Sequence, residues 1–311
     1  MNVKSTAVKQ WDGLFKGITI FSAGLVFVVM IGILIQLIGS SSLSLHKFGF
    51  GFLTSNKWNP VLEEFGAASS VFGTLVSTLI AMLIAVPLSL VIALFLVELA
   101  PPVISKPVGG AIELLAAIPS IIYGMWGLFV FAPFMADHIQ PFLGETLGFI
   151  PLFSGPPMGI GMLTAGMILA LMILPFITAV MRDVFHMVPS VVKESAHGMG
   201  STTWEVTKKV TMKYGVKGLL GASFLGLGRA IGETMAVTFV IGNDHTISHS
   251  LFAPSNSIAS TLANEFTEAS EPMYLSALVE LGLVLFVVTL IIQIIAQLWV
   301  KRLQKQMGAG L

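Results

Sequence analysis

The chain has 311 residues, of which 55% are hydrophobic and only 10% are charged. Soluble domains carry roughly 25% charged residues, so this composition excludes an ordinary soluble domain, and its high hydrophobic content excludes a disordered chain. The formal net charge is zero and cysteine is absent, which argues against a nucleic-acid-binding protein and excludes disulfides and thiolate metal sites.

Apolar residues form six runs, each long enough for the roughly 20 helical residues that cross a bilayer. The runs cover residues 17–38, 69–97, 110–136, 158–181, 216–242 and 275–299. They are too long and too poor in alternation to be barrel strands. The first run exceeds the length of a signal-peptide core and no cleavage motif follows it, so we expect an uncleaved spanning helix. The sequence therefore predicts an all-α membrane protein with six transmembrane helices.

Lys and Arg residues are distributed unevenly between the connections. The N-terminal segment 1–16, the second connection, the loop 182–215 with Lys217 at its edge, and the C-terminal tail 300–311 together hold thirteen of the sixteen. The opposite set of connections holds only Lys47 and Lys57, both in the first outer loop, residues 39–68. Because positive loops stay in the cytoplasm, we expect both termini and the loop 182–215 on that side.

The loop 182–215 has local signals for two helices joined by a tight turn. Pro189 suits the first turn of a helix, and Gly200 can end it. Thr202 and Glu205 have the spacing of a capping box, which opens a second helix. We call the two expected helices and the turn between them, within residues 182–215, the knob. We interpret it as a docking surface for a partner, since apolar groups on a water-facing projection are typical of interfaces. The alternative is a solvated connector.

The same loop resembles the signature loop of permease subunits of ATP-binding-cassette importers. Glu194-Ser195-Ala196 stands where the family has Glu-Ala-Ala, and Gly200 stands at the following glycine. The chain departs from the pattern at Ser195 and at Lys213, which replaces a proline after the second helix. The resemblance implies that this loop fits a groove on an ATPase subunit. The expected coupling residues are Glu194, Ser195, Ala196, Gly200 and Trp204.

Further segments resemble a narrower group, the PstC-type phosphate permeases. They are Trp58-Asn59-Pro60 and residues 72–75, 84–89, 113–124 and 226–237. The resemblance implies a type I importer permease (MetI-like) fold in a bacterial or archaeal inner membrane. It also implies a PstA-like second permease, two PstB-like ATPase subunits that carry ATP and Mg, and a PstS-like phosphate-binding protein. This subunit would then bind no cofactor or metal and have no catalytic residue. The chain itself has no Walker A loop for ATP hydrolysis.

One charged residue lies in the middle of an apolar run. Arg229 is near the centre of run 216–242, where a charge costs about 2.5–3.5 kcal/mol, so it must face protein or water. Glu233 follows four residues later, which places it on the same helix face about 6 Å further outward. The two residues are either an ion pair that fixes packing or the lining of an anion path. Hydroxyls of Thr234, Thr238 and Ser120 are the other expected path groups, and Pro119 permits a local break beside Ser120.

Other functions stay open at the level of the residues alone. A permease for another oxyanion, such as molybdate or sulfate, would have the same composition, and so would a gradient-driven secondary transporter or a membrane sensor. Glu280, near the outer end of the last run, is expected at the membrane surface. Asp244, His245 and His249 have metal-like spacing, but exposed sets of this kind are rarely sites.

Overall fold

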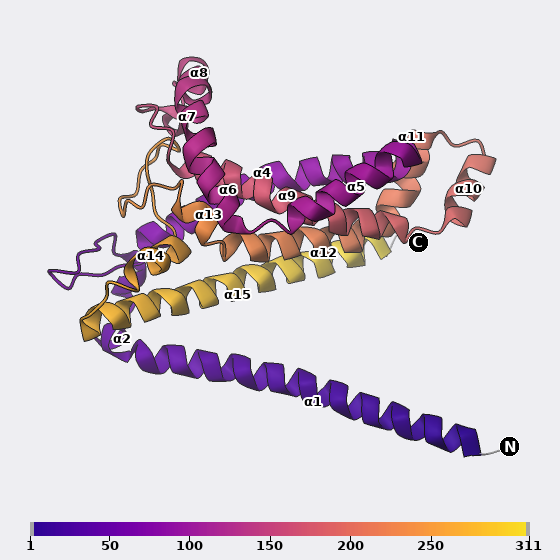
Figure 1. Ribbon diagram of the computed structural model, residues 1–311, viewed down its shortest axis with the longest axis horizontal. Coiled ribbons are helices and arrows are strands. Elements are labelled where there is room, and N and C mark those ends of the chain that lie inside the picture. The colour runs from indigo at the N-terminus through magenta and orange to yellow at the C-terminus, as the bar shows by residue number, and fades with distance from the viewer. Residues whose placement is uncertain (1–2, 309–311) are drawn as a thin grey trace.

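The computed structural model describes residues 3–308, with side chains described for residues 13–302. The long helices are α1 (Val3–Ser40), α4 (Ala68–Leu94), α9 (Met162–His186), α12 (Met212–Ile231) and α15 (Pro272–Gly308) (Figure 1). The shorter helices are α2 (Ser42–Phe48), α3 (Gly51–Thr54), α5 (Pro102–Ala116), α6 (Ser120–Trp126), α7 (Ala132–Phe134), α8 (Gln140–Leu147), α10 (Ser190–Gly198), α11 (Thr203–Val206), α13 (Met235–Thr238) and α14 (Ile258–Glu265). Four π-helical turns, η1 (Phe95–Leu99), η2 (Gly127–Phe131), η3 (Met135–Ile139) and η5 (Thr207–Thr211), and one 3-10 turn, η4 (Pro151–Phe153), complete the set. Within the described residues no strand forms beyond two isolated bridges, so the all-α prediction is confirmed.

Five helical stretches are long and apolar enough to cross a membrane. They are Gly13–Ser40, Ala68–Leu99, Ser120–Leu147, Met162–His186 and Pro272–Arg302. α12 has 20 residues, about 30 Å of helix, but its glycines and the basic residues Lys213, Lys217 and Arg229 lower its hydropathy. The prediction of a membrane protein is therefore confirmed. Five of the six predicted transmembrane helices are found by length and hydropathy, and α12 is counted as the sixth because it packs against α4, α9 and α15.

α9 lies at the centre of the bundle and is the most buried of these helices. It packs along α4 and α12, and small residues let the backbones approach. A Cβ on Gly166 of α9 would lie only 2.6 Å from Ile80 of α4. α4 itself buries mainly small side chains such as Ala81 and Ala85. This close packing makes α4 and α9 the rigid frame on which the other helices are placed.

α1 stands apart from the bundle and meets α15 only at the end near α2 (Figure 1). None of its apolar window is buried within the chain. The segment after it, residues 39–68, contains the helices α2 and α3, so it is more ordered than the simple outer loop expected from the sequence. We refer below to the end of the bundle with α10 and α11 as the α10 end, and to the opposite one as the α14 end.

Two of the predicted spans are interrupted. The run 110–136 is split: α5 ends at Ala116, and a new helix begins at Ser120 and continues to Leu147. Pro119 causes the split, because it has no N–H and restricts the residue before it. The run 216–242 is also split, since residues 232–234 separate α12 from α13. The break beside Pro119 agrees with the local break expected there, whereas the expectation of one continuous helix over run 216–242 is wrong.

Candidate functional site

The helices that follow the two interruptions pack against each other. α6 contacts α13 closely at Gly124, where an added Cβ would lie 2.7 Å from the Phe239 ring and 2.9 Å from the Met235 carbonyl oxygen. Ser120 begins α6, and the half-buried Thr234 and Thr238 flank α13. The structure thus brings three of the five expected path residues onto two packed elements. Irregular backbone is tolerated at membrane depth where it is buried in protein or lines a water-filled cavity.

Glu233 stabilises the start of α13. Its Oε1 accepts a hydrogen bond from the Ala236 N–H at 3.2 Å, which satisfies one of the free donors of the short helix. The Thr238 hydroxyl donates to the Thr234 carbonyl oxygen at 2.7 Å. Because α12 ends at Ile231, Glu233 is not one turn beyond Arg229 on a continuous helix, and the expectation of a shared helix face is wrong.

Arg229 is the half-buried cation near the end of α12. Its guanidinium carbon lies 5.3 Å from the centre of the Phe176 ring of α9. It makes no ion pair with any residue that the structure describes, Glu233 included. A cation–π contact contributes about 0.5–2 kcal/mol, less than the insertion cost of about 2.5–3.5 kcal/mol. In this conformation the charge is therefore available to water or to an anion.

The knob has the local structure predicted for it. α10 ends at Gly198, Gly200 adopts φ +87°, and the Glu205 N–H donates to the Thr202 hydroxyl at 3.3 Å in a complete capping box. The backbone N–H of Thr202, followed by Lys209, holds the pKa of Glu205 below its ordinary value. Beyond the box, α11 continues through the π-helical turn η5 into α12 without a gap, and Lys213 lies in the first turn of α12.

The knob presents most of its expected coupling residues to solvent. Glu194, Ser195 and Gly200 are exposed, and Trp204 keeps 67% of its surface accessible. Ala196 differs, because it is only 7% exposed. Its part in the knob is therefore packing rather than surface contact.

A partly buried polar cluster at the α14 end was not predicted from the sequence. Glu265 accepts hydrogen bonds from Trp58 Nε1 at 2.6 Å and from the Tyr274 hydroxyl at 2.7 Å, and its other oxygen lies 3.1 Å from His245 Nε2. The Trp58 and His245 rings stack at 5.2 Å. Burial is the largest influence on the pKa of Glu265 and raises it, but the three hydrogen bonds together outweigh burial and lower the pKa. We call Trp58, His245, Glu265 and Tyr274 the Glu265 cluster.

The cluster also accounts for one residue of the metal-like set. His245 is engaged with Glu265, and the described residues contain no group of three potential ligands that could hold a metal ion. Glu280 differs from its expected place at the membrane surface, since it is only 3% exposed and lies on α15 beside Leu45 of α2.

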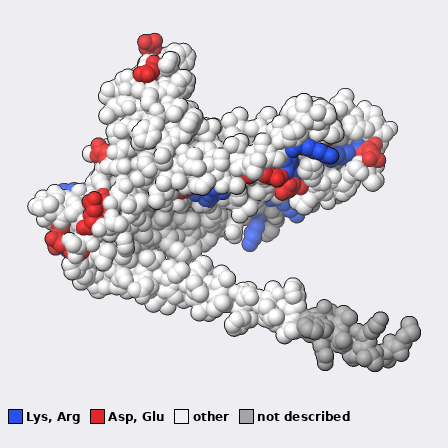
Figure 2. All heavy atoms as spheres, viewed as in Figure 1, with Lys and Arg blue, Asp and Glu red and all other residues white. Residues whose placement is uncertain are grey.

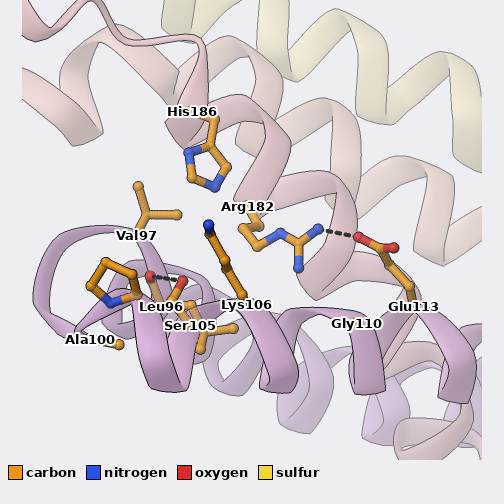
Figure 3. Close-up of a pocket in the computed structure, with 10 residues that line it drawn as sticks. Leu96, Val97, Ala100, Ser105, Lys106, Gly110, Glu113, Arg182 and His186 are labelled. Carbon is orange, nitrogen blue, oxygen red and sulfur yellow. Dashed lines mark hydrogen bonds and ion pairs between the residues drawn. The ribbon is translucent and has the colours of Figure 1, made fainter.

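A cavity of about 540 Å³ lies at the α10 end between η1, α5 and α9 (Figure 3). Lys106, Arg182 and His186 point into it, and the Arg182 guanidinium pairs with the exposed Glu113 on its rim. None of the expected path residues lines this cavity. Figure 2 shows that basic side chains concentrate toward this end, whereas acidic ones dominate the α14 end and α8.

Comparison with known proteins covers nearly the whole chain. Residues 65–305 match the family described as "Binding-protein-dependent transport system inner membrane component". The chain is 55% identical to "Phosphate transport system permease protein PstC" of Mesorhizobium japonicum, over 96% of this chain and 92% of that protein. It is 55% identical to the protein of the same name from Pasteurella multocida, over 95% and 93%. A chain in the crystal structure of a bacterial alginate ABC transporter, complexed with a periplasmic protein that holds an alginate pentasaccharide, has the same fold. That chain is 17% identical with a TM-score of 0.63, and the match covers 95% of this chain and 98% of that one.

Proposed function

The chain belongs to the binding-protein-dependent transport system inner membrane components and, among them, to the PstC-type permeases, and we propose that it forms one half of the phosphate path in an ATP-driven importer. The near full-length similarity to phosphate permeases supports phosphate rather than molybdate or sulfate as the substrate. A permease role also fits because the chain matches membrane components over nearly its full length and contains no Walker A loop.

Arg229 is the structural observation that best supports an anion path. Its guanidinium is half-buried in the membrane region and has no carboxylate partner among the described residues. A planar guanidinium can hold two phosphate oxygens at once. Thr234, in the neighbouring interruption at residues 232–234, supplies one hydroxyl donor. Ser120, at the start of the packed helix α6, supplies another. Glu233 sits at the same interruption and keeps the site from holding phosphate too strongly.

The proposed assembly rests on the similarity to PstC-type permeases. A PstA-like permease supplies the other half of the path, two PstB-like ATPase subunits bind ATP and Mg, and a PstS-like protein delivers phosphate. The knob docks on one ATPase subunit through Glu194, Ser195, Gly200 and Trp204, while Ala196 keeps α10 in place. The α10 end and both termini are then cytoplasmic, and the α14 end receives the binding protein. The basic residues near α10 agree with this orientation.

Uptake of radioactive phosphate into liposomes tests the proposal. The complete complex is reconstituted with ATP inside the vesicles and the binding protein outside. We expect uptake to require both and to be reduced by unlabelled phosphate but not by molybdate or sulfate. Uptake that continues without ATP and is abolished by an ionophore would show a gradient-driven transporter instead.

A further inference from the structure

A single carboxylate at the end of α4 connects three segments that are far apart in the sequence. Lys193 Nζ of α10 lies 2.6 Å from Glu98 Oε1, and the Thr211 hydroxyl donates to the same oxygen at 3.1 Å. Glu98 belongs to η1, which continues α4, and Thr211 belongs to η5, which continues into α12. The carboxylate therefore ties the knob to two membrane helices at once.

The contact is shielded from solvent. The Glu98 and Lys193 side chains are 11% and 20% exposed, and Thr211 is completely buried. The knob's other ion pair, Lys209 with Glu205, is 67% and 42% exposed and joins residues of the same helical stretch. Exposed pairs contribute little, whereas removing one partner of a buried pair leaves a charge without compensation. Of these two ion pairs, the Glu98 contact is therefore the one that can fix the knob against the bundle.

α10 has an inner and an outer side with different partners. Lys193 and Ala196, three residues apart, point toward the bundle and are shielded. Glu194 and Ser195 point away from the bundle and are exposed. The groups expected to touch an ATPase and the groups that hold α10 to α4 are thus separate residues on one helix.

α4 extends from this contact to the other end of the bundle. Together with η1 it spans Ala68–Leu99, about 48 Å of helix. At the α14 end the Thr74 hydroxyl accepts a hydrogen bond from the Ile258 N–H at 3.0 Å, and the Ser70 hydroxyl lies 3.2 Å from that of Thr261. Both partners belong to α14, which ends in Glu265. A displacement of α10 can therefore reach the Glu265 cluster through one uninterrupted helical stretch, α4 with η1.

We propose that Glu98, with Lys193 and Thr211, is a positioning joint that transmits movement of the ATPase-docked knob to α4. The inference rests on the proposed function, because it assumes that the knob docks on an ATPase. In the proposed joint, Glu98 contacts neither phosphate nor ATP. Glu98 makes the knob and α4 move as one body. ATP-driven movement of the knob at the α10 end therefore displaces the α14 end of the bundle.

Distance measurements on the assembled complex test the joint without any transport. The chain has no cysteine, so spin labels can be placed at two introduced cysteines, Val191→Cys on α10 and Val103→Cys on α5, both at exposed positions. We expect one narrow distance in the parent and a broad distribution in Glu98→Gln and in Lys193→Met. The double variant Glu98→Lys with Lys193→Glu should restore a narrow distribution of the distance between the two labels. Lys209→Met, which removes the exposed ion pair of the same knob, is the control and should leave the distance unchanged.

Transport per ATP hydrolysed tests the role of the joint. In Glu98→Gln we expect ATPase subunits to co-purify at the normal ratio, because the outward residues of α10 are intact. Phosphate uptake per ATP should fall about tenfold, within the 5- to 150-fold range of coupling between sites. Unchanged uptake per ATP, or a narrow label distance in both single variants, would overturn the joint. Loss of the ATPase subunits would overturn it in favour of a docking role. A parent complex that lacks ATP-dependent phosphate uptake would contradict the proposed function, and the label distances would still decide the joint.

Discussion

Replacing Glu265 by glutamine should loosen the α14 end without changing the shape of the side chain. The glutamine oxygen can still accept from Trp58 and Tyr274, but both bonds change from charged to neutral. Hydrogen bonds to charged groups contribute about 1.5–3 kcal/mol and neutral ones about 0.5–1.5 kcal/mol, so each bond loses about 1 kcal/mol. The expected loss is therefore about 2 kcal/mol in the free energy of local opening. That corresponds to roughly 30-fold faster exchange of the protected α14 amides, since 1.4 kcal/mol is a factor of ten.

Hydrogen-exchange mass spectrometry of the complex in lipid nanodiscs measures this opening. Glu268→Gln is the matched control, because Glu268 is an exposed acid three residues further along that makes no ion pair with the described residues. We expect α14 of the control to exchange at the parent rate. Equal exchange in the two variants would refute the reasoning that the charge on Glu265 holds the cluster together.

The pH dependence of the same measurement has a definite sign. The pKa of Glu265 lies below its ordinary value of 4.5 in the folded protein, so the ionised carboxylate stabilises the cluster above that value. This stability is lost as the pH falls below about 4.5 and passes through the folded pKa. The protection of α14, corrected for intrinsic exchange, should therefore decline in this window in the parent. In Glu265→Gln the part of the decline that is due to this carboxylate should be absent, and because other titrating groups act in both proteins, the difference between parent and variant isolates it.

Three further substitutions test the path, the knob and the frame. Arg229→Gln should reduce phosphate uptake about 10- to 150-fold, the equivalent of about 1.5–3 kcal/mol for a charged hydrogen bond, with the complex still assembled; unchanged uptake would exclude Arg229 from the path. Gly200→Val should weaken recovery of the ATPase subunits in co-purification, because φ is +87° there, whereas Gly198→Ala, in open space with ordinary φ, should not. Gly73→Ala should lower the thermal stability by about 1–3 kcal/mol, because its Cβ would overlap a backbone carbonyl oxygen before α14, and Gly110→Ala, which has open space, should be neutral or slightly stabilising. The last pair is compared by thermal unfolding in detergent, and equal midpoints would show that α4 can shift to accept the methyl group.

Local signals in the sequence were sufficient for the knob. The capping box of Thr202 and Glu205 and the positive φ of Gly200 depend on neighbouring residues, so the spacing alone predicts them. The split beside Pro119 is local in the same way, although its consequence, a helix that continues to Leu147, is not. Hydropathy was sufficient to predict the membrane-spanning helices, because insertion of a segment into lipid depends on its own composition.

The errors arose where the outcome depends on contacts across the bundle. The spacing of Arg229 and Glu233 places them on one face only if the helix continues, and Gly232, which caps α12 after Ile231, is one of several glycines in the run and does not stand out as its end. The Glu98–Lys193 contact joins residues 95 positions apart, and the Trp58–Glu265 contact joins residues 207 positions apart. Side chains of this kind look like isolated charges or aromatics until the fold brings them together.

The isolation of α1 has a consequence for how the chain is made. Its window Gly13–Ser40 has a mean hydropathy of 2.8 and no burial inside the protein, so it can enter the membrane on its own as soon as it is synthesised. α12 is the opposite case, because its glycines and basic residues disfavour insertion as a single helix. It needs α4 and α9 already in place to receive it. Biosynthesis is therefore expected to anchor the chain within its first 40 residues and to complete the part that carries Arg229 only after the frame has formed.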